Sequence, residues 1–165
     1  MKKIYLIASM ALLLLPFIAG AATINAASCE QVDVQAAVNS AQDGDIVIVP
    51  EGNCTWYTLA SHAPALSIKG KSITLNGAGI GKTFIIDETS DCVAGKYGEH
   101  LITIDGVAGK PFRITGFTMR RRDRNDTDSH FINIIGTSKS WRVDHNEFIS
   151  AAFGSPDASV SVNGL

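Results

Sequence analysis

Two stretches of this 165-residue chain decide its fold: HLITIDGVAGKPFRITGF at residues 100–117 and HFINIIGTSKSWRVDHNEF at residues 130–148. They repeat one another about thirty residues apart, so that His100 matches His130 and Phe112 matches Trp141. A looser copy precedes them at residues 66–77, and a further copy begins at residues 160–164. A recurring period of this length is typical of a protein built from stacked structural repeats.

Each copy contains two short runs in which apolar and polar residues alternate, and each run ends near Gly or Asn. This pattern predicts half-buried strands followed by turns. No segment with helical periodicity separates the copies, and a repeat of two or three strands must stack on its neighbours to bury its apolar side. We therefore predict an all-β fold, a right-handed parallel β-helix in which each copy forms one turn, or rung.

Alignment of the copies predicts which side chains face inward. One predicted inward column is Ile68, Ile102, Ile132 and Val160, and a flanking column is Leu66, Ile104, Ile134 and Val162. A second wall is filled by Ile73, Phe112 and Trp141 together with Leu75, Ile114 and Val143. This aliphatic and aromatic ladder is the expected core.

The first residues have the layout of a secretory signal peptide. Lys2 and Lys3 precede an apolar stretch at residues 4–18, and small residues follow at 19–21 and again at 26–28. We expect residues 1–27 to be a signal peptide, cleaved somewhere between residues 21 and 28, and residues 28–165 to form the β-helix domain of an exported protein. The apolar stretch is short for a membrane span, so no stable span is expected after processing.

Charge and motifs exclude two classes of ligand. The net charge of −2 becomes −4 once Lys2 and Lys3 are removed, which argues against a nucleic-acid partner. Residues 77–83 imitate a phosphate-binding loop, but Asn76 stands where that loop requires Gly. β-branched and aromatic residues follow at once instead of a helix, so we expect no nucleotide site.

Three cysteines in an oxidising compartment leave one unpaired. We predict a disulfide between Cys29 and Cys54, with Cys92 as a buried free thiol. The two bridged cysteines flank a segment in which Asp33 could cap a helix and Gly44 could end it. The apolar side of this helix would cover the first rung, and it consists of Val34, Ala37, Val38 and Ala41.

The most concentrated positive charge lies at Arg120, Arg121, Arg122 and Arg124, which we place in a loop between rungs. Planar guanidinium groups suit the carboxylates of an acidic glycan, so these four are candidate glycan-binding residues. The alternative is a solvated loop in which nearby acids offset the arginines.

Other polar residues are expected on rung surfaces. Arg113 and Arg142 share an outward column, where Asp144 would relieve their repulsion. His100 and His130 are expected to stack at a rung corner, and a metal site there would lack a third ligand. His62 has neither a nucleophile nor an orienting acid near it in the sequence, so no catalytic triad is proposed.

Residues 141–148, WRVDHNEF, resemble the Trp-hydrophobic-Asp-His segment of the pectate lyase family, with Arg142 as an extra residue. Residues 32–52 look like the capping helix and first strand common to pectin-lyase-like β-helices. The resemblance implies an acidic polysaccharide as substrate class and calcium as the cofactor of the family. It places Asp157 as a candidate calcium ligand, while Ser161 stands where the family has a second acid.

The resemblance leaves catalytic residues unassigned, because the family's arginine base would lie on rungs beyond residue 165. Residues 160–165 begin a new rung with no closing cap, so we expect this chain to be the N-terminal part of a longer protein. Two functions follow. One is an exported enzyme that cleaves an acidic polysaccharide by elimination or hydrolysis; the alternative is a non-catalytic glycan-binding or cell-surface β-helix.

Overall fold

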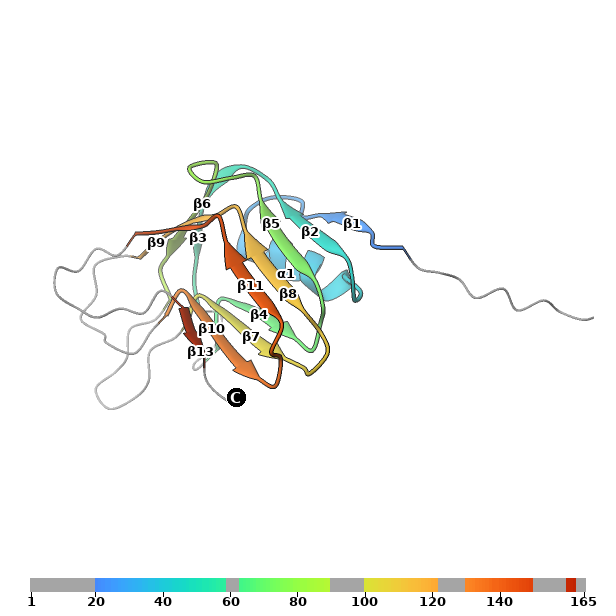
Figure 1. Ribbon diagram of the computed structural model, residues 1–165. Coiled ribbons are helices and arrows are strands. Elements are labelled where there is room, and N and C mark those ends of the chain that lie inside the picture. Colours follow the sequence, from blue (N-terminus) through green and yellow to red (C-terminus); the bar gives the residue numbers. More distant parts are fainter. Residues whose placement is uncertain (1–19, 59–62, 90–99, 122–129, 150–159, 163–165) are drawn as a thin grey trace, which may run out of the picture.

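The computed structural model describes residues 20–58, 63–89, 100–121, 130–149 and 160–162. Nearly all of the regular structure is parallel β-sheet, in three sheets (Figure 1). Sheet one contains β1 (Thr23–Asn25), β2 (Ile46–Val49), β5 (Thr74–Gly77), β8 (Phe112–Thr115) and β11 (Trp141–Asp144). Sheet two contains β3 (Gly52–Trp56), β6 (Thr83–Asp87), β9 (Thr118–Arg121) and β12 (Glu147–Ile149). Sheet three contains β4 (Leu66–Lys69), β7 (Ile102–Gly106), β10 (Ile132–Gly136) and β13 (Val160–Val162).

From β2 onward, the chain visits sheets one, two and three in turn and then begins again. In each sheet, a strand pairs in parallel with the strand of the previous rung, so the arrangement is compatible with a parallel β-solenoid. The repeat pattern predicts inward columns for two walls only. Sheet two is a third wall, and its strand β9 contains Arg120 and Arg121, which were predicted to lie in a loop between rungs.

One outward column runs along sheet three. Ser67, Thr103, Asn133 and Ser161 are successive partners. The inward columns differ from the predicted ones by two residues in the first copy, because Leu66 rather than Ile68 pairs with Ile102. Apolar alternation has a period of two, so a slip of two residues keeps every side chain on its face, and the pattern could not exclude it.

The second wall has the predicted register but not all of the predicted burial. Leu75 pairs with Ile114, which pairs with Val143, and Phe112 pairs with Trp141. Phe112 is 4% exposed, whereas Trp141 is 37% exposed. The prediction that Trp141 is buried is therefore wrong, because β11 is the outermost described strand of sheet one and only β8 pairs with it.

Helix α1 (Gln31–Ser40) packs against β4, β2 and β3. The predicted apolar side is confirmed: Val34, Ala37, Val38 and Ala41 are all buried. Asp33 is not the N-cap, which is Glu30. Asp33 lies in the first turn and accepts a hydrogen bond of 2.6 Å from Ser28 Oγ. Among the described residues, no helix is long and apolar enough to cross a membrane.

Side chains of α1 satisfy the backbone of the edge strand β4. The Gln35 amide accepts a 2.9 Å hydrogen bond from Ser67 N and donates one of 3.0 Å to Ser67 O. Gln31 donates to Ala65 O, just before β4, and accepts from Tyr57 N, just after β3. These amides take the place of a neighbouring strand, which protects an edge that would otherwise be open to pairing with another chain.

The predicted disulfide is confirmed. Cys29 and Cys54 are bridged, with their Cα atoms 5.8 Å apart, and the bond joins the segment before α1 to β3. Trp56 is fully buried beside it and donates a 2.9 Å hydrogen bond from its indole nitrogen to Cys29 O. Cys92 lies outside the described residues, so its predicted free state stays a prediction.

Candidate functional site

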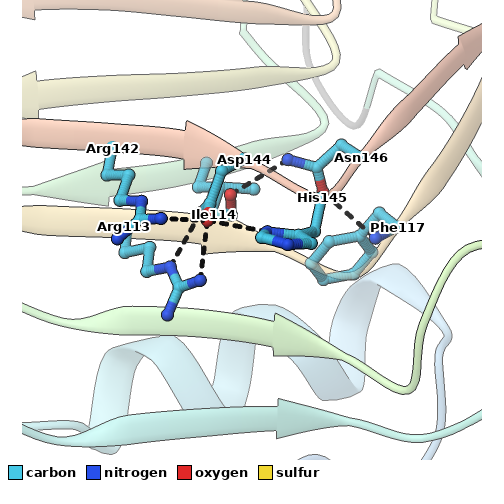
Figure 2. Close-up of polar contacts among 7 residues, drawn as sticks. All are labelled: Arg113, Ile114, Phe117, Arg142, Asp144, His145 and Asn146. Carbon is cyan, nitrogen blue, oxygen red and sulfur yellow. Dashed lines mark hydrogen bonds and ion pairs between the residues drawn. The ribbon is translucent and has the colours of Figure 1, made fainter.

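Asp144 lies at the centre of a polar cluster on the outer face of sheet one. Arg113 Nε donates to Asp144 Oδ1 and Arg113 Nη2 donates to Oδ2, each at 2.7 Å. Arg142 Nη2 lies 3.0 Å from Oδ2, and His145 Nδ1 lies 2.8 Å from the same oxygen. Figure 2 shows the two guanidinium groups meeting the carboxylate from one side and the imidazole from the other.

Parallel pairing brings these residues together. Arg142 is the register partner of Arg113, and Asp144 is the partner of Thr115. The guanidinium of Arg113 therefore reaches across one rung to the carboxylate of the next. This geometry agrees with the expectation that Asp144 relieves repulsion between two stacked arginines.

The cluster keeps Asp144 ionised. The hydrogen bonds from Arg113 hold the pKa of the Asp144 carboxyl well below its usual range, and the contacts with His145 and Arg142 lower this pKa further. The same bonds to Asp144 raise the pKa of Arg113. Two guanidinium groups against one carboxylate leave one net positive charge on this surface.

His145 is held in an unusual backbone conformation. Its φ angle is 53°, in the left-handed region, whereas the residue at the same place one rung earlier is Gly116, with φ 82°. A side chain at such a position costs about 1 kcal/mol relative to glycine. The imidazole is 73% exposed. Because an ionised carboxylate only accepts hydrogen bonds, Asp144 holds the proton of His145 on Nδ1 and leaves Nε2 facing solvent.

Asn146 fixes the turn that carries His145. Its amide donates a 3.0 Å hydrogen bond to Ile114 O and accepts one of 3.0 Å from Phe117 N (Figure 2). The His145 carbonyl also accepts a bond from Gly116 N. These hydrogen bonds join the turn to the previous rung, so they fix the backbone that carries the Asp144–His145 contact.

A groove of about 480 Å³ runs across the first residues of β5, β8 and β11. Its walls combine apolar surface with the two arginines that hold Asp144. The main lining residues are Ile73, Pro111, Phe112, Trp141, Arg113 and Arg142. Arg113 and Arg142 therefore connect the groove to the Asp144–His145 pair.

The predicted glycan-binding arginines do not form one loop. Arg120 and Arg121 belong to strand β9, and Arg120 is exposed. Arg121 is 3% exposed, its Nε lies 3.3 Å from Asp87 Oδ2, and its guanidinium lies 4.6 Å from the ring centroid of Phe131. Strand alternation and a buried acid on β6 turn the Arg121 side chain toward the interior. Arg122 and Arg124 lie outside the described residues.

The described residues do not fit calcium. Ser67, Thr103, Asn133 and Ser161 form the outward column of sheet three, and none of them carries a carboxylate. Calcium requires six to eight oxygens, several of them carboxylate. No group of three His, Cys, Asp or Glu side chains that could hold a metal occurs in the described part of the chain. The candidate ligand Asp157 lies outside it, as does His62.

His100 and His130 stack as predicted. Their ring centroids are 5.2 Å apart, the ring planes differ by 7°, and His130 N donates a 3.1 Å hydrogen bond to His100 Nδ1. The two histidines lie at equivalent positions in successive rungs, just before β7 and β10. The buried Asp87–Arg121 pair was missed, because the strand that carries Asp87 was not recognised as a wall.

Comparison of the chain with protein-family models, with curated proteins and with solved structures found no match. The fold and the site therefore define the protein only by class. It is a mainly parallel β protein that is compatible with a β-solenoid. Its described residues include one disulfide and an Arg–Asp–Arg cluster beside a groove.

Proposed function

We propose that the chain belongs to an exported, right-handed β-helix protein of the pectate lyase-like kind, with α1 as its N-terminal cap, and that it binds an acidic polysaccharide. The observation that carries this proposal is the cluster of Arg113, Asp144 and Arg142 beside the groove. It gives one net positive charge on a surface that also offers aromatic and apolar contacts.

Arg142 is the side chain best placed to meet a uronate carboxylate. It is 65% exposed, and its contact with Asp144 uses only part of its guanidinium. A guanidinium has five N–H donors in a planar fork that matches a carboxylate. Arg113, bound to Asp144 through two nitrogens, is a positioning residue that keeps Asp144 from binding Arg142 with both oxygens.

The groove supplies the apolar surface that a sugar-binding site also requires. Ligand sites combine apolar surface with a few placed polar groups. Here the partly exposed ring of Trp141 offers apolar surface next to the two arginines. A polymer that leaves the groove at Trp141 and reaches His145 would cover a further distance of about 13 Å, at roughly 3.3 Å per residue.

Calorimetry of the disulfide-bonded protein against polygalacturonate and a neutral glucan tests the proposal. We expect binding to the acidic polymer that weakens with salt and falls at least tenfold in Arg142→Gln. Lys82→Gln removes one exposed charge outside the groove and serves as the matched control. Equal affinity for both polymers, or a loss in Arg120→Gln instead of Arg142→Gln, would contradict this site.

A catalytic function is the second candidate, favoured by the 2.8 Å contact between His145 Nδ1 and Asp144. A guanidinium that holds a uronate carboxylate makes the proton on the adjacent C5 more acidic. His145 Nε2 would take that proton, and the C5–H electrons would form a C4–C5 double bond. The C4–oxygen bond would break, and the imidazolium would protonate the departing oxygen.

The two candidates are separable in one experiment. Cleavage by elimination gives an unsaturated uronate with a new ultraviolet absorbance. If His145→Gln abolishes the absorbance but still binds the polymer, the catalytic role is supported. Binding by the unaltered protein with no absorbance change would leave it a glycan-binding protein.

A further inference from the structure

Ala22 is the first of the described residues for which backbone hydrogen bonds are observed. Strand β1 pairs in parallel with β2, with Thr23 opposite Ile46 and Asn25 opposite Ile48. Ile46 N donates to Ala22 O at 2.8 Å, and Ala26 N donates to Ile48 O at 2.9 Å. Residues 22–26 therefore form the edge of sheet one, where Ala22 is exposed, as are Gly20 and Ala21.

The backbone nitrogen of Ala22 meets a carboxylate. It donates a 2.8 Å hydrogen bond to Asp45 Oδ1, and the other oxygen of Asp45 accepts a 2.7 Å bond from Gln42 N. Asp45 is 6% exposed and precedes β2. The bonds from Gln42 and then from Ala22 lower the pKa of its carboxyl, so the acceptor at Ala22 is anionic at neutral pH.

We propose that export removes residues 1–21, and that the new N-terminal ammonium of Ala22 forms an ion pair with Asp45. The bond between Ala21 and Ala22 follows Ala19, Gly20 and Ala21, small residues of the kind that precede such cleavage sites. A membrane-bound signal peptidase would hydrolyse the bond with water, giving a carboxylate on Ala21 and an ammonium on Ala22. The inference rests on the expected signal peptide and is independent of glycan binding.

The alternative run of small residues at 26–28 is disfavoured by the fold. Cleavage there would remove β1 together with Ala26, which is 6% exposed, and Ile24, which packs against the core. It would also leave β2 as an open edge and Asp45 without its bond from Ala22. Cleavage after Ala21 keeps all of these contacts and replaces a neutral donor by a charged one at the same position.

The position of cleavage is tested by exporting the full chain from a bacterial host and measuring the intact mass and N-terminal sequence of the released protein. We expect the mature chain to begin at Ala22. A chain that begins at Thr23 or later, or one that keeps residues 1–21, overturns the proposal.

The ion pair is tested with two versions of the protein, one that begins at Ala22 and one that begins at Gly20. Asp45→Asn is introduced in each, which gives a double-mutant cycle. We expect the substitution to change the unfolding equilibrium on the order of threefold more in the version that begins at Ala22. The difference should vanish at alkaline pH, where the amine is neutral. Equal effects at neutral pH would overturn the ion pair.

Discussion

Arg121 and Asp87 form a buried ion pair that links β9 to β6: Arg121 Nε lies 3.3 Å from Asp87 Oδ2, and the two side chains are 3% and 0% exposed. Asp87 also accepts hydrogen bonds from the backbone and hydroxyl of Thr89. The second arginine of the predicted glycan-binding cluster is therefore part of the interior of the protein.

Removal of one partner should destabilise the protein strongly. Asp87→Ala removes the buried carboxylate that pairs with the Arg121 guanidinium, and we expect a loss of about 3–5 kcal/mol in the free energy of unfolding. Denaturant unfolding followed by circular dichroism measures it. Glu88→Ala, which alters the neighbouring half-buried acid, should cost much less, and similar losses for the two variants would argue against a buried pair.

The two register partners on β8 and β11 should respond differently to truncation. Phe112→Ala creates a cavity in the core and should cost about 3–5 kcal/mol. Trp141→Ala should cost clearly less, because that ring is already 37% exposed. Unfolding midpoints of the two variants make the comparison, and a larger loss at Trp141 would mean that the ring is covered in the folded protein.

Breaking the disulfide should loosen the N-terminal region. The bridge closes a loop with a sequence separation of 25 residues. In the chain-entropy model, a loop of this size contributes about 3 kcal/mol. We expect Cys29→Ser to lower the free energy of unfolding by about 3 kcal/mol and to increase hydrogen exchange in α1. Non-reducing peptide mapping should show Cys92 outside any cross-link; a cross-link through Cys92 would contradict the pairing.

Acid should weaken the Asp144 cluster. Arg113, and then His145 and Arg142, lower the folded-state pKa of Asp144 below its unfolded value of about 3.9. A lowered pKa gives stability that is present above the unfolded value and is lost as pH falls through the folded value. Stability should therefore fall more steeply below about pH 4 in the unaltered protein than in Asp144→Asn. Urea midpoints between neutral and acid pH test this, with Asp105→Asn as an exposed carboxylate control.

Local patterns in the sequence predicted much of this protein correctly. The repeat at residues 100–148 predicted parallel stacking, because alternation shows which side chains share a face and the repeat spacing shows which strands are neighbours. The face of α1, the Cys29–Cys54 bridge and the stacking of His100 on His130 follow from the same local reasoning.

Only the tertiary structure decided what depends on neighbours distant in the chain. It added sheet two as a third wall, and it chose between two registers at Leu66 that alternation treats as equal. It turned Arg121 inward because Asp87 lies on the adjacent strand, and it left Trp141 partly exposed because only one of the described strands pairs with β11. A sequence shows which face a side chain takes, but burial and charge pairing depend on what the fold brings against that face.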